Sequence, residues 1–352
     1  MTPHEIGLLR LVAQRIAGPG TATPADAVRL LGAMQAQDPT GAILSVALRT
    51  EGGTRQAVQA AYDAGEIVKS WPMRGTLHLV AAEDLPWLLP LTTPRILGGH
   101  TARLAELGLD ARALGRAREL AEEALSGGRS LRRADLMAVW DKGGLETTGQ
   151  RGYHMLGNLS QSGVLCFGPT LDGEQAVVLI EEWIPNPREL ARDEALGELA
   201  TRYFLGHGPA TLKDFMRWAH QLTGDARTGL TLARPALANA EVDGTEYFMA
   251  PGTPDLLSAH RAEAEGLFLL PGFDEYVLGY QNRSAVLAPE FADRIVPGGN
   301  GVFRPTVVNA GQIIGTWKQT IRTKTRTITP TPFTTFPKGV PEAIDTAYAA
   351  LP

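Results

Sequence analysis

The chain has 352 residues, of which 44% are hydrophobic and 20% charged, as is ordinary for a folded protein of two or three domains. Its single cysteine, Cys166, excludes an internal disulfide and a cysteine-based zinc site, and favours a reducing cytoplasm. The net charge of −5 argues against a general nucleic-acid coat, so any DNA-binding surface must be local. The N-terminus is amphipathic and contains Arg10 and Arg15, unlike a secretory signal, and no apolar run is long enough to span a membrane.

Two glutamines one residue apart, Gln35 and Gln37, stand where a helix is expected to stop. Apolar residues three apart predict a helix over Ala25–Met34. Pro39 has no N–H and disfavours helical backbone in the residue before it, so that helix should end near Gln35 or Ala36. If the next residues are extended, both carboxamides point the same way and could hold a water or read a base edge. The alternative is that Gln35 caps the helix end and Gln37 is plain surface.

Helix, helix and hairpin follow one another three times along the chain, which is the order of a winged helix. The hairpins are expected at 67–71 with 75–80, at 164–167 with 176–180, and at 240–250, where Asp243-Gly244 is a strong turn signal. The helices before them are expected around 56–63, 131–140, 148–163, 195–205, 212–220 and 227–232. The predicted fold class is therefore α+β. It has three tandem winged-helix units (1–110, 111–190 and 191–255) in a curved body, followed by a β-rich C-terminal region (256–352).

The C-terminal region combines strands with a local excess of positive charge. Strands are expected at 267–270, 305–308 and 313–317, and a final helix at 341–349. No Asp or Glu occurs between Arg294 and Pro341, and the even positions Lys318, Arg322, Lys324 and Arg326 should share one face of a strand. That face could follow DNA phosphates, although a solvated edge strand protected from aggregation explains the same pattern.

Four stretches of the sequence resemble one family. They are 34–38, 70–78, 269–276 with Gly279-Tyr280, and 311–317. Together they resemble the tandem winged-helix DNA glycosylases, the AlkZ/YcaQ-like group that includes the azinomycin-resistance glycosylase AlkZ and its enteric relative YcaQ. The resemblance covers almost the whole chain. Its most specific marker is Trp71-Pro-Met-Arg-Gly-Thr-Leu-His78, because this string is long and serves no generic turn or cap.

The resemblance implies a monofunctional glycosylase that excises N7-alkylated purines from double-stranded DNA and can unhook interstrand crosslinks, without a metal or cofactor. Gln35 and Gln37 match the family's Gln-x-Gln motif, with the apolar Ala36 between them. In the enteric branch the second position is an aspartate. A neutral pair is a poor general base, which suits a substrate that is already activated by its positive charge. The neighbouring Asp38 could supply carboxylate chemistry or cap the next element.

Other polar residues of these stretches have predicted roles. Arg74 and His78 lie beside the first hairpin and could contact phosphate, although a satisfied, partly buried His78 explains that residue nearly as well. Of Asp274 and Glu275, one is expected to anchor a loop by an ion pair with Arg283, Arg74 or another nearby cation, and neither is given a catalytic role.

The sequence thus predicts a cytoplasmic, monomeric DNA glycosylase without membrane association. One alternative is a winged-helix transcriptional regulator without an active site, which would usually dimerise to match a palindrome. The other is a winged-helix protein-interaction scaffold, whose binding would be indifferent to salt because it makes no phosphate contacts.

Overall fold

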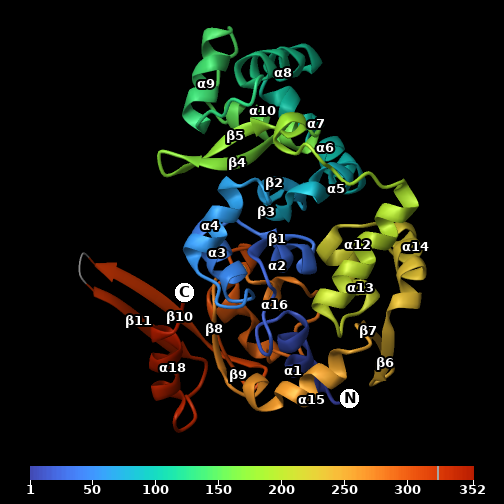
Figure 1. The fold of residues 1–352 in the computed structure, drawn as a ribbon, viewed down its shortest axis with the longest axis vertical. Helices are drawn as coiled ribbons and strands as arrows, with labels where there is room; N and C mark the ends of the chain where they lie inside the picture. The colour runs from blue at the N-terminus through green and yellow to red at the C-terminus, as the bar shows by residue number, and fades with distance from the viewer. Residues whose placement is uncertain (323–324) are drawn as a thin grey trace. The chain divides into compact units, whose positions relative to one another are not determined.

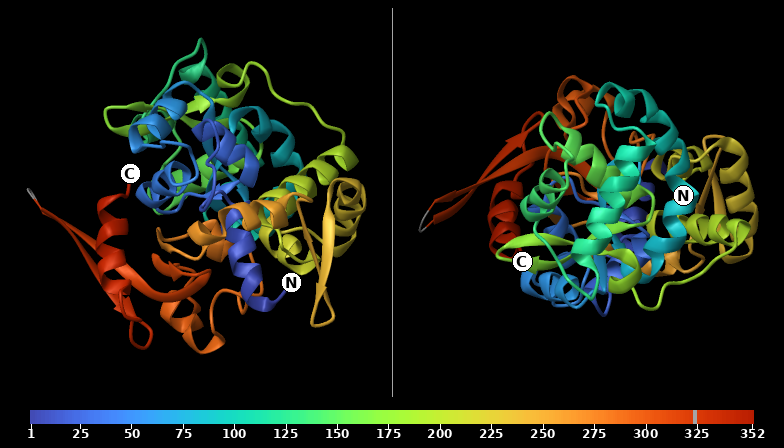
Figure 2. Two further views of the ribbon diagram at one scale, coloured as in Figure 1. Left: turned by 60° about the horizontal axis from the view of Figure 1, so that its bottom comes forward. Right: turned by 90° about the horizontal axis from the view of Figure 1, so that it is seen from above.

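Helices and strands follow one another throughout the computed structural model, which describes residues 1–322 and 325–352 (Figure 1). Contacts within the chain define two compact units. The split unit consists of Met1–Val58 together with Leu196–Pro352, and the inserted unit is Gln59–Ala195. In the split unit, residues from the two ends of the chain form one body, with the helix α1 (Pro3–Ala13) packed against α15 (Thr253–Ala264), as Figure 2 shows.

An antiparallel sheet organises the inserted unit. Its strands, in pairing order, are β3 (Thr76–Ala81), β2 (Ile67–Met73), β4 (Leu165–Leu171) and β5 (Glu174–Leu179). The turn between β2 and β3 is made by Arg74 and Gly75, whose φ angles of 55° and 68° are the left-handed values of a tight hairpin turn. Both hairpins predicted in this part of the sequence are confirmed.

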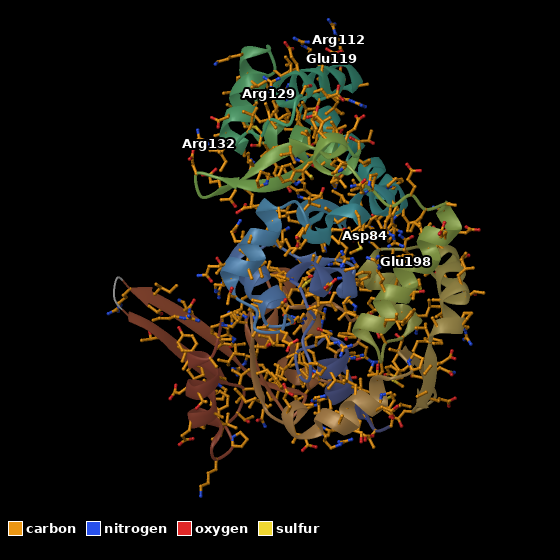
Figure 3. All side chains as sticks on the ribbon, in the orientation of Figure 1. Asp84, Arg112, Glu119, Arg129, Arg132 and Glu198 are labelled. Atoms are coloured by element: carbon orange, nitrogen blue, oxygen red, sulfur yellow. The ribbon has the colours of Figure 1, made fainter. Side chains whose placement is uncertain are left out.

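Helices of the inserted unit pack on this sheet and build its core. They are α5 (Leu85–Thr92), α6 (Pro94–Gly99), α7 (Thr101–Glu106), α8 (Ala111–Leu125), α9 (Arg133–Lys142), α10 (Arg151–Gln161), α11 (Ile180–Trp183) and the 3-10 turn η1 (Ala82–Asp84); α4 (Arg55–Asp63) leads into the unit. In α8, apolar residues spaced three and four apart face a core that contains Trp71 and Trp140. Arg112 and Glu119 lie on the outer side of α8 (Figure 3).

The larger sheet of the split unit pairs in the order β11-β10-β9-β8. The strands are β8 (Leu267–Leu270), β9 (Thr306–Asn309), β10 (Gln312–Arg322) and β11 (Thr325–Pro332), and all neighbours are antiparallel. Ala310 and Gly311, with φ angles of 48° and 75°, form the turn from β9 to β10. A Cβ on Gly7 would lie 2.5 Å from the Gly311 carbonyl oxygen, so α1 packs directly on this turn.

The remaining elements of the split unit include a second, separate hairpin. Its strands are β6 (Ala238–Val242) and β7 (Thr245–Met249), joined by the predicted Asp243-Gly244 turn. The other elements are α2 (Pro24–Leu31), β1 (Met34–Gln35), α3 (Pro39–Ala47), α12 (Arg192–His207), α13 (Leu212–Ala219), α14 (Thr223–Ala233), α16 (Glu275–Leu278), α17 (Ala292–Ile295), α18 (Val340–Ala349) and the 3-10 turns η2 (Arg234–Ala236), η3 (Pro289–Phe291) and η4 (Pro297–Gly299).

The fold class is α+β, as predicted. In chain order, helices lead three times into a hairpin: β2–β3, β4–β5 and β6–β7. The two compact units are larger than these repeats, so the predicted boundaries at 110, 190 and 255 stay a prediction. Within the described residues, no helix combines the length and the apolar character needed to cross a bilayer.

The end of the second helix was predicted wrongly. α2 ends at Leu31 because Gly32, with a φ of 74°, takes a left-handed conformation that stops the helix. The residues after it are extended as β1, and Pro39 begins α3, a helix that the sequence did not predict. Pro39 therefore starts an element instead of ending one.

Candidate active site

The Gln-x-Gln motif joins α2 to α3 in the split unit. Gln35 closes β1 and is 8% exposed, Ala36 is fully buried, and Gln37 is exposed. Asp38 occupies the N-cap position of α3, but its side chain makes no capping hydrogen bond. A Cβ on Gly41 would lie 2.7 Å from Asp38 Oδ2, so the carboxylate lies over the first turn of the helix. The backbone is extended as far as Gln35, the last residue of β1. That the side chains of Gln35 and Gln37 converge on one spot stays a prediction.

A buried carboxylate holds the backbone of Gln35. The Gln35 N–H donates to Glu275 Oε1 at 3.2 Å, and Glu275 is 1% exposed at the start of α16. The other oxygen, Oε2, accepts the indole N–H of Trp218 at 3.0 Å and lies 3.3 Å from His207 Nε2. The motif is therefore fixed from within the split unit by a residue 240 positions away in the chain.

The adjacent acid, Asp274, forms a buried ion pair. Its two oxygens each accept a bond of 2.9 Å from the Arg49 guanidinium, and Ser45 Oγ donates to the same carboxylate at 2.6 Å. The side chains of Arg49 and Asp274 are both 0% exposed. The predicted loop anchor is thus confirmed. Its partner is the other nearby cation, Arg49, and neither of the two named candidates. Arg283 donates to the carbonyl of Val277.

Arg74 and His78 form a linked pair on the first hairpin. Arg74 Nη2 and His78 Nε2 are 2.8 Å apart, and His78 Nδ1 lies 2.8 Å from the Thr76 carbonyl oxygen. A guanidinium can only donate and a carbonyl can only accept, so His78 is a neutral imidazole with its proton on Nδ1. Because His78 is 0% exposed, it holds Arg74 and does not itself face solvent or phosphate.

The basic residues of the C-terminal region do not share one face, because the segment turns. β10 and β11 form a hairpin in which Ile321 stands opposite Arg326, whereas Lys318 stands opposite Thr329. Opposite residues share a face and successive residues alternate, so Lys318 and Arg322 lie on one face and Arg326 on the other. The Arg326 guanidinium lies 5.0 Å from the ring centre of Tyr348 in α18. Lys324 lies outside the described residues.

Comparison with known proteins identifies the family. The chain matches the family model described as DNA glycosylase AlkZ-like over residues 28–351. This protein belongs to the AlkZ-like DNA glycosylase family. It is 31% identical over 323 residues to the interstrand DNA cross-link repair glycosylase of Streptomyces sahachiroi, covering 83% of this chain and 81% of the relative. The solved structure of Streptomyces sahachiroi DNA glycosylase AlkZ superposes with a TM-score of 0.80 at 26% identity, covering 99% of this chain and 95% of that chain.

The predicted family and the predicted DNA glycosylase activity are therefore confirmed. The sequence alone did not predict that Glu275 accepts the Gln35 N–H, or that Trp218 and His207 contact the same carboxylate. Glu275 lies in one of the four stretches that carry the family resemblance, and this could have marked it as a functional residue. Trp218 and His207 gave no such signal, because only the folded chain brings α12 and α13 next to β1.

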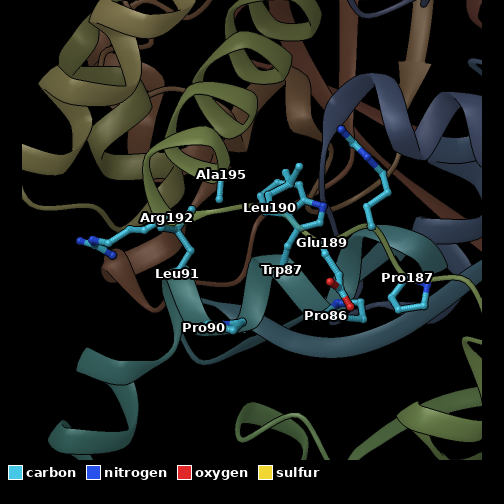
Figure 4. A pocket seen from close by; sticks show the side chains of 10 residues that line it. Pro86, Trp87, Pro90, Leu91, Pro187, Glu189, Leu190, Arg192 and Ala195 are labelled. Carbon is cyan, nitrogen blue, oxygen red and sulfur yellow. The ribbon is translucent and has the colours of Figure 1, made fainter.

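A cavity of about 470 Å³ lies elsewhere, in the inserted unit (Figure 4). Trp87 and Leu91 of α5 and Arg188 and Leu190 of the following linker are among its lining residues. Asp84 Oδ1 accepts from both Trp87 Nε1 and Arg188 Nη1, at 2.9 and 3.0 Å, which ties the linker to the start of α5. None of the predicted catalytic or DNA-binding residues lines this cavity.

Proposed function

We propose that this DNA glycosylase hydrolyses the N-glycosidic bond of N7-alkylated purines in double-stranded DNA and unhooks interstrand crosslinks formed at such positions. The observation that carries the proposal is the Gln35-Ala36-Gln37 motif, held at a fixed point of the AlkZ-like fold by the bond from the Gln35 N–H to Glu275. The relative in Streptomyces sahachiroi is named as a cross-link repair glycosylase, which supports the same substrate class here.

The reaction needs neither a strong general acid nor a strong general base. Alkylation at N7 places a positive charge on the purine, so the bond between C1′ and N9 is already weakened. When this bond breaks, its electrons neutralise the purine, which leaves as the free base, and water adds to C1′ and gives its proton to solvent. Gln35 and Gln37 orient this water through their amide oxygens and turn their dipoles towards the cationic sugar. Neither a metal nor a cofactor is required.

The DNA backbone is bound by positive side chains of the two hairpins. Arg74, which His78 orients, contacts phosphate from the β2–β3 turn. Lys318 and Arg322 do so from one face of the β10–β11 hairpin and Arg326 from its other face. Lys324, which lies outside the described residues, is included from the sequence alone. Because a glycosylase can act on one lesion at a time, we infer a monomer. The single cysteine supports a cytoplasmic location.

The test is release of free base from a duplex that carries one N7-methylguanine. The wild type should release 7-methylguanine under single-turnover conditions, whereas Gln35→Ala and Gln37→Ala should each be slower by about a hundredfold or more, the scale of one lost preorganised polar group. Gln56→Ala, an exposed glutamine on α4, is the matched control and should keep the wild-type rate.

A second duplex with an N7-linked interstrand crosslink tests the crosslink activity. Its two strands should separate on a denaturing gel after incubation with the wild type and stay joined with Gln35→Ala. Wild-type rates in both glutamine variants would disprove the assignment of the motif.

A further inference from the structure

A buried carboxylate lies directly behind the proposed catalytic glutamines. Glu275 is 1% exposed and receives the main-chain N–H of Gln35 on Oε1 at 3.2 Å. Gln35 is the last residue of the short strand β1, and the chain bends two residues later, at Gln37. The hydrogen bond therefore fixes the backbone from which both carboxamides project.

The partners of Glu275 favour its ionised form. The Gln35 main-chain N–H and the Trp218 indole N–H can only donate, and they approach different oxygens of the carboxylate. His207 Nε2 lies 3.3 Å from Oε2, and His207 Nδ1 has no hydrogen-bond partner in the described part of the chain. Because a carboxylate oxygen only accepts, the hydrogen bond between these two atoms is donated by Nε2. Hydrogen bonds from N–H groups to both oxygens stabilise the charged state of a carboxyl group.

The surroundings of this carboxylate exclude water. The Tyr203 ring stacks on the His207 ring with 4.7 Å between centroids, and Trp218 and Tyr203 are 1% and 0% exposed. Charges interact more strongly in such surroundings than in water. The neighbouring Asp274, by contrast, is paired on both oxygens with Arg49, so this pair carries no net charge.

We propose that Glu275 is a positioning residue for glycosidic-bond hydrolysis, an inference that rests on the proposed function. Through the Gln35 N–H it fixes the first glutamine of the motif. Its negative charge also offsets the positive charge that grows on the sugar as the purine leaves. The two glutamines supply dipoles but no net charge, and the buried carboxylate behind them supplies the charge.

Glu275→Gln tests this role. A glutamine offers one oxygen and one NH₂, so whichever way it is turned, one N–H donor of Gln35 or Trp218 faces an NH₂ group. We expect the single-turnover rate of 7-methylguanine release to fall about tenfold to a hundredfold. The dissociation constant for the same duplex should stay within about twofold, because Glu275 is buried and not part of the surface that DNA can reach. Glu290→Gln, an exposed acid of the same unit, is the matched control and should leave both quantities unchanged.

The double variant shows whether Glu275 acts through Gln35. Only the part of the Glu275 effect that runs through the Gln35 side chain is lost in Gln35→Ala, so Glu275→Gln should slow Gln35→Ala by a smaller factor than it slows the wild type. A thermal melt of each variant identifies those that are folded. If Glu275→Gln does not fold, Trp218→Phe is the second test, because it keeps an aromatic ring and the carboxylate but removes one N–H donor. It should slow base release several-fold without weakening DNA binding.

The outcomes separate the two proposals. If the wild type releases the base and the folded variants keep its rate, the role of Glu275 is disproved while the proposed function stands. The same holds if the rate and the DNA affinity fall together, or if the Glu275 and Gln35 effects multiply in full. If the wild type releases no base from either duplex, the proposed function fails, and the role of Glu275 fails with it.

Discussion

At the scale of single residues, burial decides what a polar side chain contributes, and Lys69 shows the effect on stability. Lys69 lies in β2, is 8% exposed, and places its Nζ 4.8 Å from the ring centre of Phe167. Burial lowers the pKa of its ammonium group to about 8. Below about pH 8 the amine is charged in both the folded and the unfolded chain, and the folded state carries the full desolvation penalty. Above about pH 8, Lys69 loses its proton in the folded chain before it does so in the unfolded chain. The desolvation penalty therefore shrinks as the pH rises and is gone near the unfolded pKa of about 10.4.

We therefore expect Lys69→Met to stabilise the protein at pH 7 by about 2–3 kcal/mol. The advantage over the wild type should shrink as the pH rises from about 8 and be nearly lost at about pH 10. Urea unfolding of both proteins at several pH values measures this difference. Lys142→Met, at an exposed position of α9, is the control and should change stability by less than about 0.5 kcal/mol at every pH. A Lys69→Met protein less stable than the wild type at pH 7 would contradict the argument.

At the scale of elements, the β10–β11 hairpin shows how a turn redistributes charge. A single continuous strand would have aligned Lys318, Arg322 and Arg326, but the hairpin turns Arg326 to the face where α18 packs. There Gln319 Nε2 donates to Tyr348 Oη at 2.9 Å, and the Arg326 guanidinium lies 5.0 Å from the same ring. The opposite face keeps Lys318 and Arg322, both exposed.

This division predicts unequal effects on DNA binding. Lys318→Gln/Arg322→Gln should weaken binding of undamaged duplex and reduce the slope of log K against log salt by about two, since two phosphate contacts are lost. Arg326→Gln should reduce the slope by less than about one, because part of its interaction is with Tyr348. A salt titration by fluorescence anisotropy gives these slopes, with Arg112→Gln on α8 as the control that should leave the slope unchanged. Equal slopes for all four proteins would remove the hairpin from the DNA-binding surface.

At the scale of the whole molecule, long-range pairs join the two ends of the chain into the split unit. The Arg49–Asp274 ion pair connects residues 225 positions apart and is 0% exposed on both sides. Breaking a buried pair leaves a charge without its partner, which is strongly destabilising. An exposed pair in the same unit, Arg234–Glu246, with 54% and 44% exposed side chains, provides the comparison.

Asp274→Asn should accordingly lower the free energy of unfolding by about 3–5 kcal/mol, because it leaves the Arg49 guanidinium buried without a counter-charge. Glu246→Gln should cost less than about 1 kcal/mol, since water screens the exposed pair. Urea denaturation followed by circular dichroism measures both. A loss of less than about 1 kcal/mol for Asp274→Asn would show that the pair is not needed to hold the split unit together.

The features that depend on local chemistry could be predicted from the amino-acid sequence. Apolar spacing and turn residues such as Asp243-Gly244 gave the hairpins and most helices, because their signals lie within a few residues. The four family-like stretches gave the glycosylase family and the Gln-x-Gln motif. The end of α2 was misjudged because the positive φ at Gly32 overrode the regular apolar spacing.

Contacts between residues far apart in the chain became visible in the folded protein alone. The fold paired Asp274 with Arg49, turned Arg326 away from Lys318, and buried His78 behind Arg74. It also placed Glu275 against the backbone of Gln35. None of these contacts has a spacing signal in the sequence, because each forms only when whole elements pack against one another and exclude water.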